Sequence, residues 1–118
     1  MNVFLAQIKH RLIHTKSENF TNLGNEVHHS FSVVKKFFFD TGFQIQGFAD
    51  LDTKKYFFLS KTDKLGSLIE LPISLDFISA LESASDLEKQ RVKKALKKED
   101  LHKAHIEILK MLDRQCLI

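Results

Sequence analysis

The feature that most constrains this chain is a run of short apolar segments between residues 37 and 71, separated by polar breaks. Short segments rich in aromatic and branched residues, bounded by turn residues, are typical of strands. The run predicts an α+β domain with a small three-stranded antiparallel meander over about residues 43–71. N-terminal helices and three C-terminal helices are expected to flank this meander and to cover its apolar face.

Details of the run assign the individual strands. Phe43 and Ile45 alternate with glutamines, and Gly47 interrupts the alternation as a β-bulge would. The segment 56–59 is apolar on both faces, so it is expected to be the central strand. Pro72 cannot donate a hydrogen bond to a central ladder, and the sheet is therefore expected to end there.

The residues before the meander have helical spacing. Over 2–15, apolar residues recur at helical intervals, which predicts an amphipathic helix. Over 26–40, a helix capped by Asn25 competes with a strand, because the aromatic and β-branched residues favour extended backbone. The helix is preferred, and the strand remains the alternative.

Three helices are expected after the meander. Ser74 is a candidate N-cap for the first, and residues 85–88 form a capping box that begins the second. The apolar positions before residue 98 point roughly 150° away from those after residue 100 when residues are laid out at about 100° each. A break is therefore predicted at 98–100, with Asp100 capping a last helix over about 101–115. This last helix should lie against the sheet, and its apolar stripe consists of Leu101, His105, Ile108 and Leu112.

Length and composition place the chain among single globular domains. Its 118 residues, 43% hydrophobic and 28% charged, suffice for one core without metals or disulfides, so 1–118 is taken as one domain. The single cysteine, Cys116, excludes an internal disulfide and predicts a reducing, cytoplasmic location. The sequence shows neither a signal-peptide pattern nor a window near the roughly 18 apolar residues of a membrane span. No membrane contact is expected.

The strongest functional hint is a run of cations in which six of ten residues are lysine or arginine. Its members are Lys89, Arg91, Lys93, Lys94, Lys97 and Lys98. Several cations on one surface can bind the phosphates or carboxylates of a partner. Because the segment has few apolar residues, its helix is expected to be held loosely and to offer its charges outward. A solvated face is the alternative, since Glu88, Glu99 and Asp100 offset part of the charge.

The sequence contains no complete set of residues for catalysis or metal binding at a recognisable spacing. His10 and His14 have i, i+4 spacing, and no third ligand accompanies them. The same holds for His102 and His105 at i, i+3 spacing. Cys116 has no evident base or oxyanion hole, and phosphate-binding glycine loops are missing from the sequence. No catalytic residue, metal or cofactor is predicted, and the chain is interpreted as a protein other than an enzyme.

The preferred function is therefore a non-catalytic macromolecular interaction. The chain is interpreted as a regulatory or adaptor protein that binds another protein, acidic in character, through the basic helical face. The alternative is a nucleic-acid-binding protein that contacts phosphates through Lys89–Lys98. An edge strand, at 43–50 or 67–71, could also pair with a second copy to form a homodimer.

Overall fold

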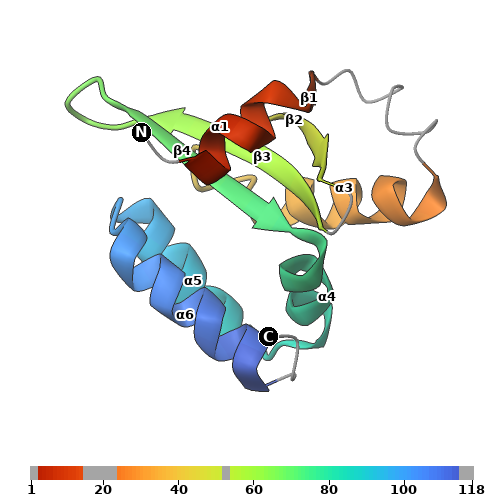
Figure 1. Ribbon diagram of the computed structural model, residues 1–118. Coiled ribbons are helices and arrows are strands. Elements are labelled where there is room, and N and C mark those ends of the chain that lie inside the picture. Colours follow the sequence, from red (N-terminus) through yellow and green to blue (C-terminus); the bar gives the residue numbers. More distant parts are fainter. Residues whose placement is uncertain (1–2, 15–23, 52–53, 115–118) are drawn as a thin grey trace.

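The computed structural model describes residues 3–14, 24–51 and 54–114, which form five helices and four strands (Figure 1). In chain order these elements are α1 (Val3–His10), β1 (Leu12–His14), α3 (Asn25–Phe37), β2 (Gln44–Asp50), β3 (Lys55–Thr62), β4 (Leu68–Ser74), α4 (Leu75–Ser83), α5 (Asp86–Lys97) and α6 (Leu101–Arg114). The strands form one antiparallel sheet in the order β1-β2-β3-β4. The predicted α+β class, with helices on both sides of the meander in sequence, is confirmed.

The predicted meander corresponds to β2, β3 and β4, and the short strand β1 extends it by one strand. The expectation of a single helix over 2–15 is wrong at its C-terminal end. Helix α1 ends at His10, and Leu12–His14 pair with residues 47–49 of β2. Backbone groups that would otherwise continue the helix are thus satisfied by the sheet.

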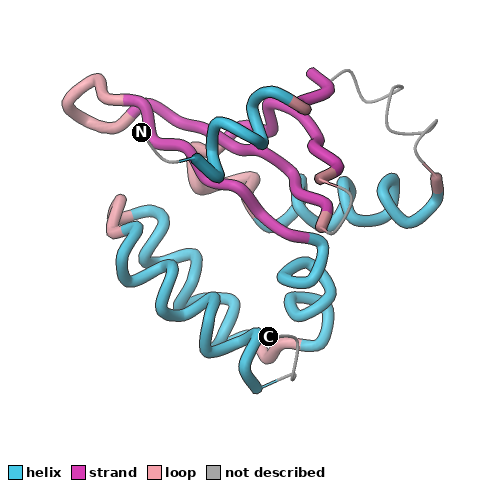
Figure 2. Tube along the Cα trace, in the orientation of Figure 1, coloured by secondary structure: helices cyan, strands magenta, loops and turns pink. Residues whose placement is uncertain are grey.

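Strand β3 lies in the middle of the sheet and buries side chains on both faces, as predicted. On one face, Phe57 and Leu59 belong to the main core, to which α3, α4, α5 and α6 contribute. On the other face, Phe58 packs with Ile8 of α1 and Ala49 of β2 in a smaller cluster. Figure 2 shows α1 crossing the strands at a distance from the pair of helices α5 and α6.

The bulge and the proline of the sheet lie where the sequence suggested, but only the bulge has the expected effect. The register shifts between Ile45 and Gly47, which confirms a bulge at this point of β2. The prediction that the sheet ends at Pro72 is wrong, because β4 continues to Ser74 and Pro72 is paired with Phe58. Proline is tolerated there because β4 stands at one end of the strand order, where an outward-facing N–H is dispensable.

Residues 25–37 are helical, which confirms the preferred reading of this segment over the strand. The helix buries Val27, Ser30, Val34 and Phe37. This spacing of three to four residues places all of them on one face toward the core. The N-cap is Gly24 instead of Asn25, and its backbone φ of 106° is one that glycine adopts without strain.

The C-terminal helices begin and end close to the predicted residues. Ser74 caps α4 by accepting a hydrogen bond from the Phe77 N–H at 3.2 Å, and Ser85 and Glu88 form the expected capping box of α5. Asp100 caps α6 by accepting from the Lys103 N–H at 3.0 Å. Between α5 and α6 the chain reverses, so the two helices lie side by side (Figure 1).

The packing of α5 and α6 differs from the sequence-based expectation. Helix α6 packs chiefly on α5 and α4, not on the sheet. Of its predicted stripe, Leu112 is buried and Leu101 and Ile108 pack partly buried against the core, whereas His105 is exposed. Ala104 and Met111 are buried in addition. Helix α5 is firmly anchored, because Val92 and Leu96 are fully buried in the main core. The expectation of a loosely held basic helix is therefore wrong.

A nearly buried ion pair connects the sheet to the turn between α5 and α6. The Lys61 Nζ lies 3.5 Å from the Glu99 Oε2, and the two side chains are 11% and 19% exposed. Lys61 also donates to the Thr41 carbonyl oxygen at 3.2 Å and lies over the Phe43 ring. Glu99 has a φ of 59°, in the left-handed region that side chains other than glycine rarely adopt. The turn thus combines backbone strain with a charge contact to β3.

Candidate partner-binding site

The six predicted cations do not share one face of α5. At about 100° per residue, Lys89, Lys93 and Lys97 follow one another along the helix, and we name them the inner stripe. Arg91, Lys94 and Lys98 form a second row, the outer stripe, roughly 130° away around the helix axis. The exposed Gln90 lies between the two rows, and the buried side of α5, which contains Val92 and Leu96, lies opposite them. The predicted basic face is therefore two separate cationic rows on a rigid helix.

The inner stripe faces the end of α3. The Lys97 Nζ lies 3.0 Å from the Asp40 Oδ2, and the Lys93 Nζ lies 3.4 Å from the Asp40 Oδ1. Lys93 also stands over the Phe37 ring, at 5.3 Å from its centroid. A single carboxylate is thus held between two ammonium groups of the stripe.

Beside Lys89 lies a shallow groove of about 280 Å³ between α3, α4 and α5. Its walls are Val33, Lys36, Phe37, Leu81, Glu82 and Lys89. Lys36 of α3 thus adds a further cation beside the inner stripe. The groove also contains one carboxylate, Glu82, which pairs with His29 at 2.9 Å on its outer side. Lys36 could not be identified as a site residue from the sequence, because its position depends on the packing of α3.

The outer stripe faces away from Asp40. Lys94 and Lys98 are exposed, and neither forms an ion pair with a residue that the structure describes. Arg91 lines a second groove of about 260 Å³ between α5 and α6, together with Glu107 and Lys110. The outer stripe is thus the more solvated of the two rows.

The contact between Asp40 and the inner stripe gives the folded state an acid sensitivity. The hydrogen bond from Lys97, with a further contribution from Lys93, holds the pKa of Asp40 below its usual 3.8, although loss of hydration opposes this. A carboxylate with a lowered pKa in the folded state stabilises that state at neutral pH. This contribution disappears as the pH falls through the lowered pKa.

We therefore expect Asp40→Asn to lower the midpoint of urea unfolding at pH 7 slightly. The difference between the variant and the unmodified protein should begin to shrink below about pH 3.8, where Asp40 of the unfolded chain becomes protonated, and should vanish below the lowered pKa of Asp40 in the folded state. Unfolding curves recorded from neutral to strongly acidic pH would measure this. A difference that stays constant across that range would show that the carboxylate does not stabilise through its charge.

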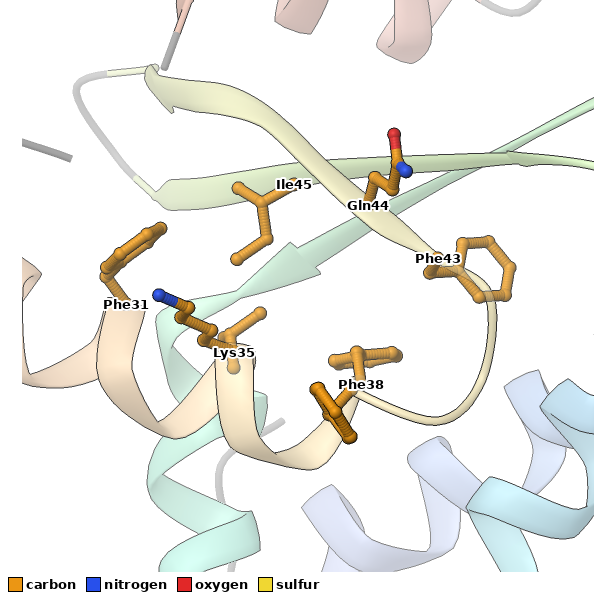
Figure 3. A pocket seen from close by; sticks show the side chains of 8 residues that line it. Phe31, Lys35, Phe38, Phe43, Gln44 and Ile45 are labelled. Atoms are coloured by element: carbon orange, nitrogen blue, oxygen red, sulfur yellow. The ribbon is translucent and has the colours of Figure 1, made fainter. Parts of the chain in front are cut away.

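A third groove, of about 360 Å³, lies between the C-terminal half of α3 and the start of β2 (Figure 3). Phe31, Phe38, Phe43 and Ile45 line it together with Lys35, whose Nζ lies 6.0 Å from the Phe31 ring centroid. At its rim Phe39 is 87% exposed, next to Asp40 in sequence. An exposed ring therefore lies at this groove, whereas the cationic run of the sequence contains no aromatic residue.

The described part of the chain shows no arrangement suited to metal binding. No group of three or more histidine, cysteine, aspartate or glutamate side chains lies close enough there to hold an ion. His10 ends α1 and His14 lies in β1, so the helical spacing on which their pairing was based does not occur. Cys116 lies outside the described residues. None of the described helices has the length and apolar character that crossing a membrane requires.

Comparisons of the chain with protein-family models, with curated proteins and with solved structures gave no match. The function is therefore inferred from the chain's own residues and their geometry.

Proposed function

We propose that this chain is a non-catalytic, cytoplasmic adaptor or regulatory protein that binds another protein through the cations of α5. The observation that carries this proposal is the arrangement of those cations on a helix whose opposite side is fully buried. A firmly packed helix presents its charges in fixed positions, so less conformational freedom is lost on binding. The inner stripe additionally adjoins a groove lined by the half-buried Val33, and apolar surface of this kind is common at the core of protein interfaces.

The proposal can be tested by affinity capture with quantitative mass spectrometry. In the test variant Lys89, Arg91 and Lys94 are all replaced by glutamine. None of these three forms an ion pair among the described residues, so the fold should persist. The matched control replaces Lys55, Lys64 and Lys103, which are exposed and lie on the sheet, the β3–β4 turn and α6. Both variants lose the same net charge.

The expected result is that a protein enriched by the unmodified chain is lost with the test variant and kept with the control. Equal capture by all three proteins would show that α5 is not the binding surface. Equal loss with both variants would show that net charge alone, and not this surface, determines capture.

Nucleic-acid binding through the outer stripe is the second candidate function. Lys94 and Lys98 are free of carboxylate partners among the described residues, and phosphates could approach them without displacing Asp40. Each phosphate neutralised by a cation releases counterions, so affinity should fall steeply with salt. Titrating labelled single-stranded and duplex oligonucleotides across a salt series would test this. Lack of binding at low salt would eliminate the candidate.

A further inference from the structure

We infer that the partner segment is an acidic helix that lies along the inner stripe and places one apolar side chain in the groove beside Lys36 and Lys89. This inference rests on the proposed protein-binding function and specifies which side of α5 is used. It is supported by the spacing of the cations, by the lining of the groove and by the ion pairs of Asp40.

The spacing of the inner stripe matches a helix that carries carboxylates on one side. Lys89, Lys93 and Lys97 are four residues apart, which at about 1.5 Å of rise per residue places them roughly 6 Å apart along the axis. Glutamates at i, i+4 and i+8 of a partner helix have the same spacing. A helix laid alongside α5 could therefore present one carboxylate to each lysine.

Asp40 shows that the stripe accepts carboxylates in the way this arrangement requires. Its two carboxylate oxygens lie 3.0 Å from the Lys97 Nζ and 3.4 Å from the Lys93 Nζ, so one carboxylate already bridges two lysines of the stripe. Lys36 and Lys89 form no ion pair among the described residues. Four ammonium groups thus face two carboxylates, Asp40 and Glu82, and a positive excess remains at the groove end of the stripe.

The groove distinguishes a protein segment from a nucleic acid. Val33, Phe37 and Leu81 provide an apolar floor between Lys36 and Lys89. A phosphate backbone would gain nothing from that floor, whereas a leucine or phenylalanine side chain would bury apolar area there. The volume of about 280 Å³ lies just below the roughly 300–1,000 Å³ typical of small-molecule sites, and it suits a single side chain.

A designed peptide can test the inference directly. The probe is a stapled helix with glutamate at every fourth position and one leucine beside that row. A first control peptide has the same composition with the glutamates and the leucine dispersed around the helix. A second control replaces the leucine by alanine. Binding is followed by amide chemical shifts of the isotope-labelled protein and by titration at moderate salt.

We expect the probe to shift the amide signals of Val33, Lys36, Leu81 and Lys89. The double variant Lys36→Gln/Lys89→Gln should bind it about threefold to tenfold more weakly, as removal of two exposed ion pairs implies. The variant Lys55→Gln/Lys64→Gln has the same net charge, lies away from α5 and should change affinity less than about twofold. The alanine peptide should bind about fivefold more weakly, because partial burial of the leucine is lost.

Three results would overturn the inference. The dispersed peptide could bind as tightly as the probe, the shifts could concentrate on Arg91, Lys94 and Lys98, or a single-stranded oligonucleotide could displace the probe from the groove. The shifts could concentrate on the outer stripe while the variant with Lys89, Arg91 and Lys94 replaced still loses its captured protein. In that case the proposed function stands and only the chosen face is wrong. If capture is also unaffected by that variant, both are wrong.

Discussion

Replacing Phe57 by alanine is expected to lower the free energy of unfolding by about 3–5 kcal/mol, as for other fully buried phenylalanines. Phe57 is 0% exposed, lies in the central strand β3 and packs its ring 5.3 Å from that of Phe48. The cavity would open where the sheet meets α3, and the surrounding rings are too large to close it fully. Urea unfolding at neutral pH would measure the loss.

The matched control for this prediction is Phe39→Ala, which removes the same atoms from a side chain that is 87% exposed. We expect a change within about 0.5 kcal/mol for it. If Phe57→Ala fails to fold, Phe57→Leu supplies a milder test, with an expected loss of about 1–2 kcal/mol. Similar effects of alanine at both positions would contradict the assignment of Phe57 to the core.

Replacing Lys61 by methionine is expected to cost about 2–3 kcal/mol of stability. The change keeps the packing on Phe43 but leaves the Glu99 carboxylate without its cation and the Thr41 carbonyl oxygen without a donor. Breaking a fully buried pair costs roughly 3–5 kcal/mol, and the slight exposure of this one reduces the figure. Thermal and urea unfolding would both report the change.

A double-mutant cycle with Glu99→Gly tests whether the pair itself is responsible. Glycine at a φ of 59° should relieve roughly 1 kcal/mol of backbone strain, and it removes the carboxylate that Lys61→Met leaves behind. The double variant should thus be more stable than the sum of the single changes predicts. Lys54→Met, at an exposed pair with Asp76, is the control and should change stability by less than about 1 kcal/mol. Strict additivity in the cycle would exclude a coupling between Lys61 and Glu99.

Much of the fold could be predicted because local signals agreed with the final packing. The capping box at 85–88, the Ser74 cap and the break at 98–100 were readable because each is decided by a few neighbouring residues. The bulge at Gly47 followed from an interrupted alternation, and the central position of β3 followed from its apolar residues on both faces. These features depend on short-range geometry, which the sequence encodes directly.

The errors occurred where a distant segment decides the structure. Leu12 and Ile13 continue the helical spacing of α1, but pairing with β2, more than thirty residues later, draws them into the sheet. Pro72 could stay within β4 because no further described strand lies beyond it. Helix α6 packs on α5, so its buried side includes Ala104 and Met111 besides Leu112 of the predicted stripe, and leaves His105 exposed.

The candidate site was predictable in composition and not in arrangement. All six cations could be named from the run 89–98, since their density is a property of the sequence. Their division into two stripes follows from helix geometry once the buried side of α5 is known. The approach of Asp40 and Lys36 depends on how α3 ends beside α5, which no local pattern records.

The order of the strands has a consequence for how the chain folds during synthesis. Only four residues separate β2 from β3, five separate β3 from β4 and three separate α5 from α6, so these contacts close short loops and should form early. Of the four described strands, β1 leaves the ribosome before the others but can pair only after residues 47–49 have emerged. We expect its amides to be the last of the sheet to gain protection in pulsed hydrogen exchange, and earlier protection would contradict this order. The strand made before the other three would then be the last to dock.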